Sequence, residues 1–261
     1  MNAPSALAVD GLTVSLNGRE VLRDVSFTLE PGAFCGLIGA NGSGKTTLLR
    51  AILGFTPPSA GQVERQGTAG YVPQKLQFAP DMPVRARDLV ALGMDGRKFG
   101  FLLPSARRRK IVENMLDSVG GLGFADQRVG ELSGGQLQRV LIAHALVSGP
   151  KILLLDEPLA NLDLRAGAEI VALLKRVAGQ GVTVLISAHD MNPLLGAMDQ
   201  LVYLANGRAA SGPTGQVVRT EVLSALYGYH IDVIRVHGRI LVVASEAGAH
   251  AHDREHVEAI P

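Results

Sequence analysis

A glycine-rich segment constrains the fold of this chain more than any other feature. Two glycines enclose four residues and are followed by lysine and threonine, in Gly39-Ala40-Asn41-Gly42-Ser43-Gly44-Lys45-Thr46. Apolar residues 34–38 before it predict a short buried strand, and residues 45–53 after it predict a helix. In that context the loop turns backbone N–H groups toward phosphate oxygens, and the helix dipole adds positive charge. The segment therefore predicts a phosphate-binding loop in an α/β fold.

Two side chains at the end of this loop suit a nucleoside triphosphate. We expect the Lys45 ammonium to reach the β and γ phosphates. The Thr46 hydroxyl is a suitable ligand for the Mg²⁺ ion that accompanies ATP. The loop therefore predicts binding of ATP with Mg²⁺ as cofactor.

The chain opens with antiparallel β structure. Residues 7–16 alternate loosely between apolar and polar side chains and lead into Asn17-Gly18. This dipeptide is the strongest short signal for a hairpin turn. Residues 21–29 then predict the returning strand, so an N-terminal antiparallel β subdomain precedes the phosphate loop.

Later strands have a different pattern, because they are continuously apolar. Residues 152–155 and 182–186 are such runs, and a helical pattern at about 165–178 separates them. Apolar strands that alternate with helices predict a mainly parallel sheet covered on both faces. Further strand signals follow at 201–205, 231–236 and 240–243.

The middle of the chain predicts an inserted helical subdomain at about 75–140. Helical patterns occur at 84–92 and 107–119, and we see no convincing strand pattern between 74 and 132. We expect one α/β ATPase domain over 5–246. Residues 247–261 are expected to form a disordered, histidine-containing tail.

Asp156 and Glu157 follow the apolar run at 152–155 directly. Ligands of open α/β sheets bind at the carboxyl ends of strands, which is where these carboxylates fall. Asp156 is a candidate second ligand of Mg²⁺. Glu157 is a candidate general base that polarises an attacking water. The alternative is a solvated strand end.

A second glycine-containing segment, Leu132-Ser133-Gly134-Gly135-Gln136, predicts another helix start. Ser133 followed three residues later by Gln136 is a capping-box pattern, which places Gly134 and Gly135 in the first turn of a helix. A helix N-terminus without bulky side chains is a second potential anion site. One bound triphosphate does not need two anion-binding helix N-termini from the same subunit.

Composition excludes several classes of protein. The chain has 261 residues, of which 47% are hydrophobic, so it is long enough to bury a substantial core. Its 25 basic and 24 acidic residues nearly cancel, so nucleic acid is not an expected partner. The single cysteine, Cys35, excludes an internal disulfide framework. The N-terminus lacks a secretory signal and no apolar run is long enough to span a bilayer, so we expect a cytoplasmic protein.

The motifs together resemble those of ABC transporter ATPases. Gly39 to Thr47 matches the phosphate loop of that family, and Leu132 to Gln136, with Gln138-Arg139 behind it, matches its signature motif. Asp156-Glu157-Pro158 and His189 match the second nucleotide motif and the switch histidine. The similarity covers roughly residues 5–215.

The resemblance implies a head-to-tail homodimer, in which each ATP lies between one subunit's phosphate loop and its partner's signature helix. It implies that Gln74 touches Mg²⁺ and the attacking water and begins the subdomain that contacts a permease. His189 is implied to hold the γ-phosphate and to position Glu157. Asp163, in Asn161-Leu162-Asp163, is implied to connect the two nucleotide sites.

One departure from the family pattern concerns the nucleotide base. The family usually has an aromatic residue in the first hairpin that stacks on adenine, whereas this chain has Leu16 there. We expect apolar contact to replace stacking and selection between ATP and GTP to be weak.

The resemblance extends to importers of transition-metal ions of the manganese or zinc type, through Ser187 to Pro193, Leu226-Tyr227-Gly228 and the strand-like ending. It implies an integral membrane permease, an extracytoplasmic solute-binding protein and a place at the cytoplasmic face of the inner membrane. Two alternatives are an iron-chelate importer and a soluble ABC ATPase without a transport role. The tail residues His250, His252, Asp253, Glu255 and His256 raise the hypothesis of a metal-sensing segment.

Overall fold

The computed structural model describes residues 5–74, 76, 78–79, 81–94 and 105–244. The chain divides into two compact units. The first unit contains residues 1–8, 28–35 and 64–188, and the second contains residues 9–27, 36–63 and 189–261. The predicted tail histidines His250, His252 and His256 lie outside the described residues.

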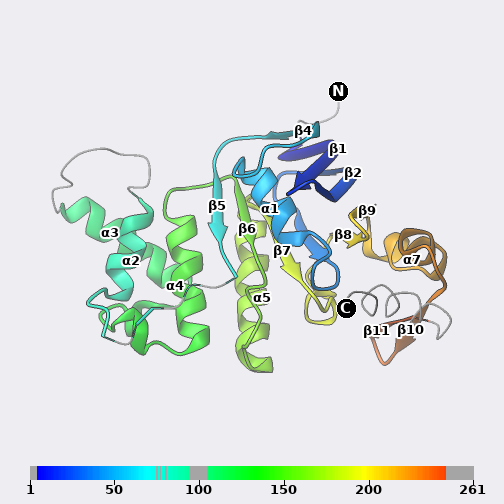
Figure 1. The fold of residues 1–261 in the computed structure, drawn as a ribbon. Coiled ribbons are helices and arrows are strands. Elements are labelled where there is room, and N and C mark those ends of the chain that lie inside the picture. Colours follow the sequence, from blue (N-terminus) through cyan, green and yellow to red (C-terminus); the bar gives the residue numbers. More distant parts are fainter. Residues whose placement is uncertain (1–4, 75, 77, 80, 95–104, 245–261) are drawn as a thin grey trace, which may run out of the picture. The chain divides into compact units, whose positions relative to one another are not determined.

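Three parallel strands form the centre of the first unit (Figure 1). They are β5 (Ala69–Val72), β6 (Ile152–Leu155) and β7 (Thr183–Ala188), with Ala69 opposite Ile152 and Ile152 opposite Thr183. Every residue of β6 and β7 is buried, as continuously apolar strands predict. Helix α5 (Leu164–Gly179) connects β6 to β7.

The remaining part of the first unit is helical. It contains α2 (Ala86–Gly93), α3 (Ala106–Ser118), α4 (Gly134–Leu146) and the short 3₁₀ turns Leu122–Phe124 and Val129–Glu131. These helices bury an apolar core that includes Val90, Val112, Leu116 and Val140. The predicted helices are confirmed to within two residues, and the described residues from 74 to 132 contain no strand.

The second unit contains most of the N-terminal sheet, with strand order β2-β1-β4. The strands are β1 (Leu7–Leu16), β2 (Arg19–Leu29) and β4 (Ala60–Arg65). Asn17 and Gly18 have φ values of 51° and 79°, as a two-residue type I′ hairpin requires. The predicted hairpin is confirmed. Strand β4 was not predicted, because its exposed, polar sequence lacks an apolar run.

The predicted strand, loop and helix around the phosphate loop are confirmed. They are strand β3 (Phe34–Ile38), the loop itself and helix α1 (Lys45–Leu53). All five residues of β3 are buried. Gly44 caps the start of α1 with a φ of 105°, and Gly54 ends it with a φ of 82°. Both angles favour glycine, so the helix has a sharp beginning and end.

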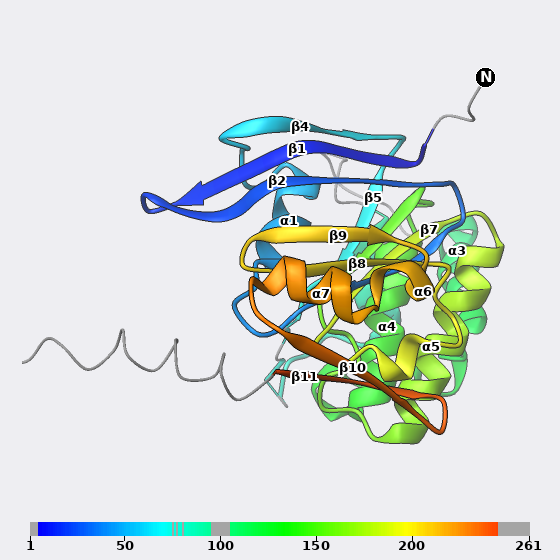
Figure 2. The same cartoon turned by 90° about the vertical axis from the view of Figure 1, so that its right-hand side faces the viewer.

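The C-terminal part of the second unit combines hairpins with short helices (Figure 2). Strands β8 (Gln200–Ala205) and β9 (Arg208–Gly212) pair antiparallel, as do β10 (Ile231–Val236) and β11 (Arg239–Ala244). A 3₁₀ turn occurs at Asn192–Leu194. Helices α6 (Thr214–Val217) and α7 (Thr220–Tyr227) were not predicted. They are too short for helical periodicity to show, and α7 depends on its packing against β10.

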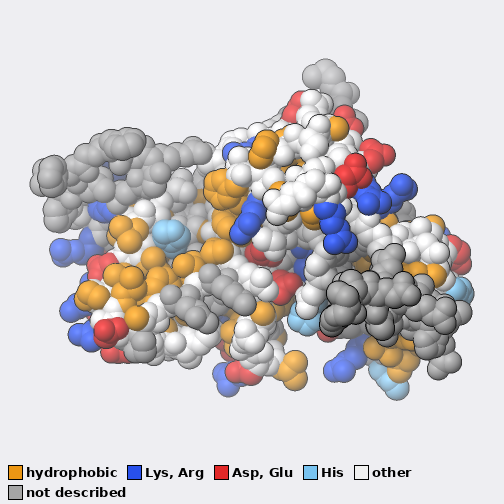
Figure 3. All heavy atoms as spheres, in the orientation of Figure 1, with side chains coloured by type: hydrophobic (Ala, Val, Ile, Leu, Met, Phe, Trp, Pro, Cys, Tyr) orange, Lys and Arg blue, Asp and Glu red, His pale blue; other side chains and the backbone are white. Residues whose placement is uncertain are grey.

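No helix within the described residues is long and apolar enough to cross a membrane. Figure 3 shows hydrophobic side chains gathered over the helical part of the first unit, with lysine and arginine side chains around the edge.

Candidate functional site

The phosphate loop holds its lysine close to its own backbone. The Lys45 side chain is buried, and its Nζ donates hydrogen bonds to the Gly39 carbonyl at 2.8 Å and the Ala40 carbonyl at 3.0 Å. An ammonium group held across the start of the loop adds positive charge to the backbone N–H groups. The local sequence therefore builds an anion site before any ligand arrives.

Two positions in this loop require glycine for different reasons. A Cβ atom on Gly39 would lie 2.4 Å from the Leu204 carbonyl oxygen and 2.6 Å from Ser43 Oγ. At Gly44, the positive φ already disfavours any other residue. Ser43 Oγ is buried and has no hydrogen-bond partner in the structure. A buried hydroxyl without a partner is unusual, and a phosphate oxygen is a suitable acceptor for it.

A single serine connects the two carboxylate residues at the end of β6. Ser187 Oγ donates to Asp156 Oδ1 at 2.8 Å and accepts from the Glu157 backbone N–H at 2.8 Å. Ser187 and Asp156 are almost completely buried. Strand pairing between β6 and β7 brings the serine to this position, which sequence reasoning did not assign to the site.

Gln74 and Glu157 meet in the first unit, a contact that the sequence analysis did not predict. Gln74 Nε2 donates to Glu157 Oε2 at 2.7 Å. Glu157 is half-buried and has a φ of 48°, in the left-handed region that non-glycine residues rarely adopt. Such a conformation costs on the order of 1–3 kcal/mol and persists where neighbouring contacts enforce it, most often at functional sites. The backbone bond to Ser187 is one such contact.

The second predicted anion site has the expected capping box. Gln136 N donates to Ser133 Oγ at 3.4 Å, and Ser133 N donates to Gln136 Oε1 at 2.9 Å. A Cβ atom on Gly134 would lie 3.3 Å from Leu162 Cδ2, so glycine permits close packing of the loop 161–163. The two segments line one cavity of about 240 Å³, and Asp163 caps α5 by accepting from Ala166 N at 2.8 Å.

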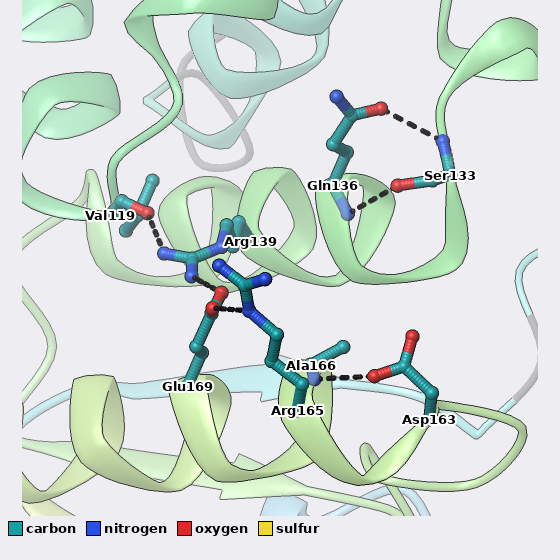
Figure 4. A network of polar contacts seen from close by, with 8 residues as sticks. All are labelled: Val119, Ser133, Gln136, Arg139, Asp163, Arg165, Ala166 and Glu169. Carbon is teal, nitrogen blue, oxygen red and sulfur yellow. Dashed lines mark hydrogen bonds and ion pairs between the residues drawn. The ribbon is translucent and has the colours of Figure 1, made fainter.

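A network of charged side chains joins the signature helix α4 to α5 (Figure 4). Arg139 donates to the Val119 carbonyl at 2.6 Å and to Glu169 Oε2 at 2.8 Å. Arg165 donates to Glu169 Oε1 at 3.1 Å. These hydrogen bonds, from Arg165 first and then Arg139, lower the pKa of Glu169 below its ordinary value. Sequence reasoning named Arg139 only as part of a motif.

His189 follows β7 directly and is exposed. It belongs to the second unit, together with the phosphate loop. The residues Gln74, Asp156, Glu157, Asp163 and the signature segment belong to the first unit. The predicted nucleotide-site residues are therefore divided between the two units. The part of the chain that the structure describes contains no group of three or more His, Cys, Asp or Glu side chains suited to hold a metal.

The residues predicted to hold Mg²⁺ have suitable chemistry. Thr46, Gln74 and Asp156 offer hydroxyl, amide and carboxylate oxygens, which are the hard ligands that Mg²⁺ prefers. Gln74 uses its side-chain nitrogen for Glu157, so its oxygen is the atom suited to a cation. The Ser187 hydrogen bond fixes one oxygen of the buried Asp156.

Comparison with known proteins identifies the family. The model for the ABC transporter family matches residues 22–160, which is more than half of the 261-residue chain. This chain belongs to the ABC transporter family. It is the ATP-binding, ATP-hydrolysing subunit of an ABC transporter complex. The predicted family and activity are confirmed.

Three similar relatives of this ABC ATPase serve metal transport systems. It is 35% identical over 233 residues to the manganese transport system ATP-binding protein MntA of Synechocystis, covering 85% of this chain and 90% of that protein. It is 35% identical over 243 residues to the zinc import ATP-binding protein ZnuC of Pseudomonas aeruginosa, covering 92% and 84%. It is 33% identical over 246 residues to the chelated iron transport system membrane protein YfeB of Yersinia pestis, covering 90% and 83%.

Solved structures confirm the predicted fold class of this ABC ATPase. A transporter described as being of the metal-chelate type matches with a TM-score of 0.80 and 28% identity, covering 93% of this chain and 98% of that chain. The bacterial ABC transporter cassette MJ0796, in a dimeric structure, matches with a TM-score of 0.68 and 28% identity, covering 79% and 98%. The fold is α/β, with a mostly parallel sheet, an N-terminal antiparallel β subdomain and a helical region.

Proposed function

We propose that this ATPase powers the import of transition-metal ions of the manganese or zinc type through a separate membrane permease. The observation that carries the proposal is the 35% identity, over most of the chain, to ATP-binding proteins named for manganese transport and for zinc import. In this proposal the described units act as one ATPase domain within residues 5–246, and the predicted tail at 247–261 lies outside the described residues.

Each site residue has a role that follows from its chemistry. Residues 39–47 grip the triphosphate through backbone N–H groups and Lys45. Thr46, Gln74 and Asp156 hold Mg²⁺, which when bound reduces the negative charge of the phosphates. Glu157 accepts a proton from the attacking water as general base. Its contacts with Gln74 and Ser187 support this role, because they fix both its carboxylate and its backbone.

The remaining predicted residues are proposed to contact the γ-phosphate or the ATP held by a second copy of the chain. His189 contacts the γ-phosphate and orients Glu157. The signature residues Ser133, Gly134, Gly135 and Gln136 contact the ATP held by a second copy of the chain. Asp163 transmits the state of one nucleotide site to the other.

A homodimer is the proposed working form. Leu164, next to Asp163, is the first residue of α5, and its side chain is 92% exposed. A leucine exposed to this extent suits a protein interface. The dimeric relative MJ0796 supports the same arrangement. ATP binding closes this dimer, and hydrolysis reopens it.

The helical part of the first unit is the proposed contact for the permease. A cavity of about 790 Å³ lies there, lined by residues of α2 and α3 that include Arg87, Ala91, Arg108, Val112 and Leu116. Walls that combine apolar side chains with charged ones of both signs suit a short amphipathic segment of a membrane protein. The ATPase would then lie at the cytoplasmic face of the inner membrane, and an extracytoplasmic solute-binding protein would deliver the cargo.

Reconstitution tests the proposed cargo. The ATPase, its permease and its solute-binding protein are placed in proteoliposomes, and uptake of Mn²⁺, Zn²⁺ and a ferric chelate is compared. We expect ATP-dependent uptake of Mn²⁺ or Zn²⁺, and none with Glu157→Gln. Absence of both, with the components assembled, contradicts the proposal.

An iron-chelate importer is the second candidate. The relative named for chelated iron transport and the metal-chelate type structure favour it. Uptake of the ferric chelate alone would select this candidate. Failure to co-purify with any membrane protein would instead favour a soluble ABC ATPase without a transport role.

A further inference from the structure

A cavity beside the phosphate loop remains without a role after the phosphates and Mg²⁺ have been assigned. Its volume is about 700 Å³, within the usual range for pockets that hold small ligands. Loop residues 40–43 form one wall, and residues 204–207, from the end of β8 and the turn to β9, form another. Val21 from β2 and Tyr227 from the end of α7 complete the apolar lining.

Contacts from three sides hold Tyr227 at this cavity. Asn206 Nδ2 donates to the Tyr227 carbonyl at 2.9 Å, which ties the end of α7 to the β8–β9 turn. The Tyr227 ring packs edge-on against Tyr203, with ring centroids 6.2 Å apart. It also contacts the Tyr229 ring in a tilted arrangement, with centroids 5.5 Å apart. The aromatic side chain is therefore supported from behind, as a rigid stacking platform requires.

The turn that holds Tyr227 is itself fixed to β2. Arg23 N donates to the Gly207 carbonyl at 2.7 Å, and a Cβ atom on Gly207 would lie 2.7 Å from the Val21 carbonyl oxygen. Glycine at 207 thus allows the turn to lie directly on the strand that leads toward the phosphate loop. The start of α1 also lies close to β2, because a Cβ atom on Gly44 would lie 3.4 Å from Val21 Cγ1.

The electrostatics of the cavity suit the sugar and base of a nucleotide rather than more phosphate. Burial raises the pKa of Tyr203, so its phenol stays neutral beside Tyr227. Of the two arginines that line the cavity, Arg23 is paired with Glu20 at 3.1 Å, which reduces its attraction for an additional anion. Leu16, the residue in place of the family's stacking aromatic, does not line this cavity.

We infer that the nucleoside part of the bound nucleotide packs against Tyr227 in this cavity while its phosphates occupy the neighbouring loop. The inference rests on the proposed nucleotide role of residues 39–47 and adds a residue to that site. An aromatic face accepts any base, so stacking on Tyr227 does not by itself select between ATP and GTP.

Binding measurements with ATP and with inorganic tripolyphosphate test the inference. Stacking on an aromatic side chain predicts that Tyr227→Ala weakens ATP binding roughly fivefold to a hundredfold. Tripolyphosphate lacks a nucleoside, so we expect its affinity to stay within about twofold. Tyr227→Phe keeps the ring face and is expected to bind ATP like the parent. Phe55→Ala is the matched control, because Phe55 is an exposed aromatic residue of the same unit that does not line the cavity.

Photolabelling of the unaltered protein with 8-azido-ATP gives a second test that needs no variant. Trypsin separates Tyr227, in the peptide 220–235, from Leu16, in the peptide 1–19. Fragmentation of the peptide 1–19 then distinguishes Leu16 from Arg19, which lines the cavity. We expect the label in 220–235.

Three results would overturn the inference: labelling of Leu16 alone, an unchanged ATP affinity in Tyr227→Ala, or equal losses for ATP and tripolyphosphate. If the parent protein binds neither compound, the proposed nucleotide site fails as well. Loss of metal uptake with normal nucleotide binding would contradict the proposed cargo and leave the role of Tyr227 standing.

Discussion

Ser187 is the residue on which the geometry of the carboxylate pair depends. Its hydroxyl hydrogen-bonds Asp156 and the backbone of Glu157 together, and its side chain is fully buried. The strained φ of Glu157 is maintained partly through this contact. A catalytic carboxylate held in this way loses little freedom when the substrate arrives.

Replacing Ser187 with alanine is expected to affect stability and turnover together. Removing the two hydrogen bonds that the hydroxyl makes with buried groups costs about 1–3 kcal/mol of unfolding free energy. A displaced Glu157 lowers kcat on the order of 10-fold to 10²-fold, whereas KM for ATP changes little because the phosphate loop is untouched. Urea denaturation and steady-state kinetics measure the two effects.

Ser118→Ala is the matched control, because the exposed Ser118 hydroxyl bonds only locally, to the carbonyl and sulfur of Met115. It is expected to leave kcat unchanged. A Ser187→Ala protein with the parent kcat would show that Glu157 is positioned by other contacts.

At the scale of elements, two helices of the first unit start with the same chemistry but serve different purposes. Ser133 caps α4 and Ser105 caps α3, each by accepting a hydrogen bond from a backbone N–H three residues ahead. Removing either cap is expected to cost about 1 kcal/mol of stability. Only the α4 start is proposed to contact ATP.

Ser133→Ala and Ser105→Ala therefore form a matched pair. We expect similar losses of stability in the two variants, but weaker ATP-dependent dimerisation only in Ser133→Ala. Thermal unfolding and sedimentation velocity with ATP measure these properties. Equal dimerisation by the two variants would remove the signature helix from the nucleotide interface.

The pairing of α4 with α5 through Glu169 predicts a specific pH dependence. Because the folded-state pKa of Glu169 is lowered, its ion pairs contribute stability above the pKa of the unfolded chain. That contribution is lost as the pH falls through the lower folded-state pKa. Glu169 and Arg165 are exposed to solvent, so the effect on stability is small.

Carboxyl NMR titration of Glu169 measures this shift directly. Arg165→Gln removes the largest cause and is expected to return the pKa toward its ordinary value. Arg176→Gln, on the same helix, is a control that should leave the titration unchanged. An ordinary Glu169 pKa in the parent protein would mean that the network does not persist in solution.

At the scale of the whole molecule, the expected output of ATP binding is the pairing of two chains. Two glycine-containing helix starts, at Gly44 and Ser133, point to a triphosphate held by two subunits. Blocking hydrolysis while preserving binding is expected to trap that pair.

Glu157→Gln is expected to lower turnover on the order of 10² to 10⁴-fold, because the amide cannot accept the proton of water. The variant should still bind ATP with Mg²⁺ and should sediment as a dimer under these conditions. Glu64→Gln, a change of an exposed carboxylate on β4, is the control and should retain full turnover and the parent's oligomeric behaviour. Normal turnover in Glu157→Gln would reassign the general base.

The sequence by itself determined the features that depend on neighbouring residues. The Asn17-Gly18 turn, the glycine-rich loop before α1 and the capping box at Ser133 were all predictable, because each is built from a few consecutive side chains and their own backbone. The continuously apolar strands β6 and β7 were predictable for the same reason.

Tertiary structure decided the contacts between residues far apart in the chain. Ser187 reaches Asp156 only because β7 pairs with β6 in one register, and Arg139 reaches Glu169 only because α4 lies beside α5. Tyr227 lies at the phosphate-loop cavity because the Asn206 turn holds a helix that no local pattern predicted. Such contacts depend on register and packing angle, which the periodicity of a single segment does not contain.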